Sequence, residues 1–153
     1  MSFRIQGLDP APFAALHALS DSALAAQGVQ RVRIDAPNAA PCRISLDDAA
    51  PGEAVLLLNH LHQGAVTPYR QQGPIFVRET QARFDGCAVP PAMRRRMLSL
   101  RAFDAAHMMI DADLVDGGEA EALIARLFTN PCAAYIHAHY ARRGCFAAAI
   151  TRA

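Results

Sequence analysis

Lysine is absent from this sequence, so all 15 basic residues are arginines. A lysine Schiff base, a lysine general base and the usual Gly-Lys-Ser/Thr phosphate loop are therefore excluded. An anion must be held by arginine, histidine or backbone amides, and arginine offers a planar fork rather than a point charge. Codon bias is the simpler explanation in so alanine-rich a chain, and the exclusions hold either way.

Long apolar runs and paired cysteine motifs are absent as well. No segment approaches the length of a membrane span, and residues 1–5 lack the apolar run of a signal peptide. The four cysteines show no CxxC spacing, which favours free thiols in a cytoplasmic protein. The 153 residues, 52% of them apolar, predict a single compact domain over residues 1–153. A net charge of +1 predicts no general attraction to nucleic acid or to membranes.

Hydrophobic periodicity and turn signals predict an α+β fold. Its mostly antiparallel sheet is built from hairpins, and two main helices pack on that sheet. The predicted helices span residues 10–28 and 119–128, and a short one spans 92–97. The predicted strands span residues 3–8, 29–34, 42–46, 54–61, 73–78, 98–103, 108–115, 132–140 and 145–151.

Several short motifs together resemble one protein family. They span residues 41–46, 51–53, 56–58, 68–70, 73–78, 108–113, 126–128, 135–139 and 144–145. In these motifs the chain resembles the bacterial family catalogued as domain of unknown function 1203. The resemblance implies a single compact bacterial domain of about this length. It implies no activity, so no catalytic residue is taken from it.

The predicted final hairpin concentrates reactive side chains. Alternate residues of a strand share one face, so Tyr135, His137 and His139 are expected to project together. Cys145 follows the turn and is expected to return towards them. Groups that titrate, bind metals or transfer protons are thereby gathered on one small patch.

The leading functional hypothesis is the binding of a small anionic molecule in a pocket. His137 or His139 would act as a base in hydrolytic or proton-transfer chemistry, while an arginine fork holds the anion. The candidate catalytic residues are His137, His139 and Cys145, and the candidate ligand-binding residues are Arg43, Tyr69, Arg70 and Tyr135.

Three alternatives remain open at this stage. A first-row metal is one, because two His-x-His pairs supply imidazoles: His60, His62, His137 and His139. A reactive thiol at Cys42 or Cys145 is the second. The third is a non-catalytic module that forms a homodimer or binds a protein through a sheet edge. Convergence of the polar groups in one place favours a ligand site, whereas scattering over a flat face favours the module.

Overall fold

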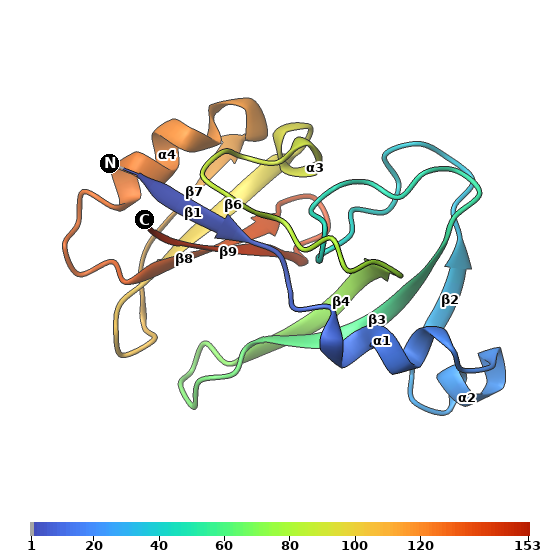
Figure 1. Ribbon diagram of the computed structural model, residues 1–153. Helices are drawn as coiled ribbons and strands as arrows, with labels where there is room; N and C mark the ends of the chain where they lie inside the picture. Colours follow the sequence, from blue (N-terminus) through green and yellow to red (C-terminus); the bar gives the residue numbers. More distant parts are fainter. Residues whose placement is uncertain (1) are drawn as a thin grey trace.

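The structure, a computed structural model, describes residues 2–153 and contains two antiparallel sheets (Figure 1). The larger sheet has six strands in the order β5-β1-β9-β8-β6-β7, and the smaller has the order β2-β3-β4. The strands are β1 (Phe3–Gln6), β2 (Gln30–Arg33), β3 (Ala54–Gln63), β4 (Gln71–Arg78), β5 (Asp85–Gly86), β6 (Met97–Phe103), β7 (Met109–Asp116), β8 (Tyr135–Tyr140) and β9 (Phe146–Arg152). The helices are α1 (Ala11–His17), α2 (Asp21–Ala25), α3 (Pro91–Arg94), the 3-10 helix η1 (Gly117–Glu119) and α4 (Ala120–Leu127).

The helix α4 covers one face of the six-stranded sheet (Figure 1). Its apolar residues recur at helical spacing, and Leu123, Ile124 and Leu127 are buried. They join a core to which the sheet contributes alternate residues of its central strands, among them Leu98, Leu100, Ala102, Ile136, Ala138 and Ile150. The opposite face of β6 and β8 is consequently left for other side chains.

The smaller sheet carries the N-terminal helices α1 and α2 (Figure 1). Phe13 and Leu24 are buried against Leu56 and other apolar residues of this sheet. The single helix predicted for residues 10–28 is wrong, because the chain breaks at Ser20. Ser20 has extended backbone, and its side chain caps α2 by accepting a hydrogen bond from the backbone amide of Ala23 at 3.2 Å.

The strand predicted for residues 42–46 is also wrong, because this segment forms a turn between the two sheets. The backbone amide of Leu46 donates to the carbonyl of Cys42 at 3.0 Å, which closes the turn. The backbone of Arg43 bonds to two other segments. Its amide donates to the carbonyl oxygen of Phe76 on β4 at 3.0 Å, and its carbonyl oxygen accepts from the amide of Leu8 at 2.7 Å. The apolar pattern of the segment therefore reflects burial between layers.

Gly7 lies between β1 and α1, pressed against this turn. A Cβ atom on Gly7 would lie 1.9 Å from the carbonyl oxygen of Ile44. We expect Gly7→Ala to lower the free energy of unfolding by about 2–3 kcal/mol, because backbone must move to relieve the overlap. Urea unfolding followed by circular dichroism measures the change. Gly73→Ala is the control, since its Cβ would meet nothing within 4 Å, and equal losses in the two variants would refute the argument.

The α+β prediction is confirmed. Adjacent strands pair as the antiparallel hairpins β3–β4, β6–β7 and β8–β9, and the two main helices pack on the sheets, α1 on the smaller and α4 on the larger. The two ends of the described chain lie side by side, because Phe3 pairs with Arg152 (Figure 1). Within residues 2–153 no helix is both long and apolar enough to cross a membrane.

Candidate functional site

The hairpin β8–β9 presents its histidines as the alternation predicts. Ile136 and Ala138 are buried in the core on the α4 side of the sheet, so His137 and His139 project from the other face. The neighbouring strand β6 adds polar residues to that same face. Arg101 lies directly across from His137, and Ser99 lies directly across from His139.

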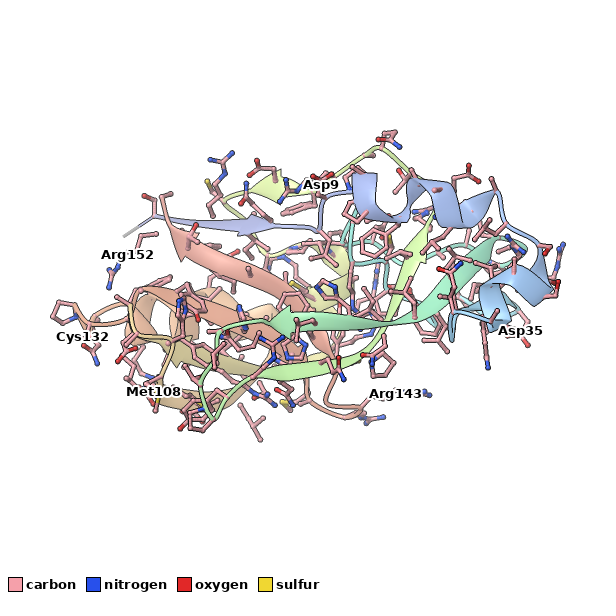
Figure 2. The ribbon with its side chains drawn as sticks, turned by 90° about the horizontal axis from the view of Figure 1, so that it is seen from below. Asp9, Asp35, Met108, Cys132, Arg143 and Arg152 are labelled. Atoms are coloured by element: carbon pink, nitrogen blue, oxygen red, sulfur yellow. The ribbon has the colours of Figure 1, made fainter. Side chains whose placement is uncertain are left out.

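A third histidine reaches this face from the smaller sheet, because the far end of the β3–β4 hairpin lies over the strands of the larger one (Figure 2). The ring centroid of His62 is 4.9 Å from that of His139 and 6.2 Å from that of His137. The ring of Phe146 stacks on His62 at 5.1 Å with an interplanar angle of 7°. His60 instead has the rings of Phe13 and Phe146 as neighbours, at 6.4 Å and 6.1 Å.

Arg101 supplies the positive charge beside these imidazoles. Its side chain is half-buried and bonds only weakly, to Ser99 Oγ and Gln71 Oε1, both at 3.3 Å. Among residues 2–153 it has no carboxylate partner, and burial lowers the pKa of its guanidinium. We call the group His62, Gln71, Ser99, Arg101, His137 and His139 the histidine–arginine site.

The imidazoles of the site are uncharged at neutral pH. Burial lowers the pKa of His137 to about 3, with further lowering by the nearby His139, His62 and Arg101. Burial lowers the pKa of His139 to about 4, and it also lowers the pKa of His62. Each neutral ring has one nitrogen with a free lone pair, which accepts hydrogen bonds or protons.

Hydrogen bonds fix which nitrogen carries the proton in two of the rings. The Nδ1 atom of His139 lies 3.0 Å from the carbonyl oxygen of Gly144, which only accepts, so Nδ1 is the donor and Nε2 has the lone pair. The Nε2 atom of His62 lies 3.3 Å from Gln71 Oε1, so its lone pair is on Nδ1. The Nδ1 atoms of His62 and His137 are buried without a hydrogen-bond partner.

Tyr135, one of the two predicted tyrosines, lies at the border of the site. The Tyr135 ring stacks on Phe103 at 5.3 Å, and Phe103 is 5.2 Å from His137. The Tyr135 hydroxyl accepts a hydrogen bond from Gln63 Nε2 at 2.8 Å and lies 2.9 Å from His107 Nδ1.

The loop between β3 and β4 brings the other predicted residues of this region. Tyr69 packs edge-on against Phe103 at 6.0 Å, the same ring on which Tyr135 stacks. Arg70 is exposed, and its guanidinium donates to the carbonyl oxygen of Gly64 within the same loop.

The structure places Arg43 and Cys145 together, at the turn between the sheets. Arg43 is only 1% exposed, and its guanidinium donates to the carbonyl oxygens of Phe146, at 2.7 Å, and Pro41. Its Nη2 lies 3.1 Å from Cys145 Sγ, and its charge lies 4.9 Å from the ring centroid of Tyr140. These contacts occupy Arg43 within the protein, and Cys145 packs against the core of the larger sheet.

Metal binding finds no support in the side-chain arrangement of residues 2–153. No group of three or more His, Cys, Asp or Glu side chains in this part of the chain is placed to hold a metal ion.

A shallow hollow on β3 and β4, lined by Leu57, Asn59 and Gln72 among others, contains none of the residues predicted to form a site.

Comparison with known proteins gives the family and nothing further. The family model described as Protein of unknown function (DUF1203) matches residues 39–152. The chain belongs to the DUF1203 family. The matched part contains the whole histidine–arginine site, so the site lies in the DUF1203 region. No curated protein and no solved structure matches the chain.

The sequence reasoning missed Arg101 and Ser99, although a signal for them exists. In the predicted strand 98–103, Ser99 and Arg101 alternate with the buried Leu98, Leu100 and Ala102. That pattern shows that the two polar residues share a face. Which strand lies beside them is decided by sheet order, which the pattern does not give.

Proposed function

We propose that this DUF1203 protein binds a small anion, a carboxylate or a phosphate, at the histidine–arginine site. The observation that carries the proposal is the half-buried Arg101 without a carboxylate partner. A buried charge without a counter-charge is costly, and a bound anion would offset that cost. An arginine fork accepts two oxygens of a carboxylate or phosphate at once.

The surroundings of Arg101 support the same proposal. No acidic side chain is part of the site, and Ser99 and Gln71 add polar groups beside the guanidinium. Burial keeps His137 and His139 neutral, so their rings can accept a hydrogen bond from the ligand. Their low pKa values make them weak bases at pH 7, so the arrangement favours binding over the predicted proton transfer by His137 or His139.

In this proposal Arg101 binds the anion, in place of the predicted Arg43. Arg43 bonds to Pro41, Phe146 and Cys145, which leaves it a supporting role in the turn between the sheets. Tyr69 and Tyr135 border the site through Phe103 and are proposed to limit the size of the ligand.

We expect Arg101→Gln to weaken the binding of acetate and of phosphate at least tenfold, because the variant removes the one fixed positive charge of the site. Isothermal titration calorimetry at pH 7 and constant ionic strength measures both dissociation constants. Arg33→Gln is the matched control, since it removes the same charge from an exposed position on β2. Unchanged binding in Arg101→Gln, or equal losses in both variants, would refute the proposed site.

The second candidate function is protein binding or homodimerisation at the edge strand β7. β7 ends the larger sheet, so one side of its backbone has no neighbouring strand within the described chain. Leu114 on β7 is 63% exposed, and Met97 on β6 is 46% exposed, which places apolar surface beside that edge. A dimer in analytical ultracentrifugation at micromolar concentration would favour this second function.

A further inference from the structure

The histidine–arginine site combines a single positive charge with unsatisfied hydrogen-bond acceptors. Arg101 is the one cationic side chain of the site, because its three imidazoles are neutral at pH 7. One positive charge matches an anion with one negative charge. A phosphate monoester carries between one and a half and two negative charges at pH 7 and matches it less well.

The imidazoles add a second requirement on the ligand. His139 has its lone pair on Nε2, because Nδ1 donates to Gly144, and no residue in the described part of the chain donates to that Nε2. The lone pair of His62 lies on Nδ1, which is buried and has no partner. Because that Nδ1 is enclosed by the protein, the lone pair left for a ligand is the one on His139 Nε2.

A simple carboxylate does not meet this second requirement, because it has only acceptor atoms and cannot donate to a lone pair. A hydroxyl group donates one hydrogen bond and accepts others. Sites built to bind a hydroxyl group discriminate strongly against an analogue that lacks it, because the polar partner is then left unpaired.

From this pairing we infer that the ligand is a small 2-hydroxy carboxylate. Its carboxylate pairs with the guanidinium of Arg101, and its hydroxyl donates to the lone pair of His139 Nε2. This inference rests on the proposed function, since it names the class of anion that the same site takes. Binding alone is inferred, and no bond of the ligand is made or broken.

Lactate and propionate form the pair of probes that tests the inference, because they have the same charge and differ by one hydroxyl group. Calorimetric titration at pH 7 and constant ionic strength should give a dissociation constant at least tenfold lower for lactate than for propionate. Arg101→Gln should lose the binding of both. His139→Phe removes one acceptor and should reduce the preference for lactate severalfold.

The possible results separate the inference from the proposed function. Equal binding of lactate and propionate overturns the inference, and binding that depends on Arg101 still supports an anion site. If neither lactate nor propionate binds, the inference is overturned; if phosphate does not bind either, the proposed function is overturned as well. His139→Leu gives a second test of the acceptor role if His139→Phe does not fold. A full preference for lactate in a folded variant that lacks the His139 imidazole would refute the assigned hydrogen bond.

Discussion

Arg43→Met should lower the free energy of unfolding by roughly 2–5 kcal/mol, because two buried carbonyl oxygens each lose a donor, which costs about 1–3 kcal/mol apiece. Arg43 is 1% exposed and has the largest of the fully buried side chains. Methionine fills much of the same volume but donates no hydrogen bond. The carbonyl oxygens of Pro41 and Phe146 would lose their side-chain donor, and Tyr140 would lose the guanidinium over its ring.

Two companion variants make this prediction specific. Arg43→Lys keeps the charge but replaces the planar fork with a single ammonium group, so it should recover less than half of the lost stability. Arg70→Met removes an exposed arginine and should change stability by less than about 0.5 kcal/mol. Urea unfolding followed by circular dichroism measures all three variants. A loss below about 1 kcal/mol in Arg43→Met would contradict the structural role assigned to Arg43.

The second large effect is a loss of stability on acidification. The pKa values of His137 and His139 are lowered to about 3 and about 4 in the folded protein, from an ordinary value near 6.5. Between pH 6.5 and pH 4 the unfolded chain therefore binds more protons than the folded one, and stability falls as the pH falls. Below about pH 6.5 each histidine lowers the stability by about 1.4 kcal/mol per pH unit. Between pH 8 and pH 5 only the part below pH 6.5 counts, so the two histidines together cost roughly 4 kcal/mol.

Denaturant unfolding at a series of pH values tests this effect. Stability should be complete above about pH 6.5 and should decrease steadily towards pH 4. His60 and His62 act in the same direction, because burial lowers their pKa values as well. His137→Phe should remove about one histidine's share of the slope. A flat profile from pH 8 to pH 5, or the same slope in wild type and His137→Phe, would contradict the assignment of neutral buried imidazoles.

Local patterns in the sequence were sufficient for much of the fold. The alternation of Tyr135, His137 and His139 against Ile136 and Ala138 predicted the shared face that the structure shows. The hairpin β6–β7 and the helix α4 also follow from spacing that lies within the segment itself. In these elements the chain buries one face, and the period of the pattern identifies it.

Where the prediction failed, the deciding interactions lie outside the segment. Residues 42–46 have the composition of a strand, yet bonds to Leu8, Phe76 and Phe146 hold Arg43 in a turn. At Ser20 the backbone is extended and the side chain caps a new helix, which interrupts an otherwise helical run. Arg101 was overlooked because β6 lies beside β8, more than thirty positions away in the chain, and only that pairing places the guanidinium opposite His137.

The binding of an anion at Arg101 is tested most directly by nuclear magnetic resonance of the histidine side chains during a titration with acetate at pH 7. Binding predicts saturable shifts in the ring signals of His137 and His139, because Arg101 and Ser99 lie directly across from these residues on β6. The same titration of Arg101→Gln should leave those signals unchanged, while Arg33→Gln should behave as wild type. Unmoved histidine signals in the wild-type protein, or equal shifts in Arg101→Gln, would contradict the account.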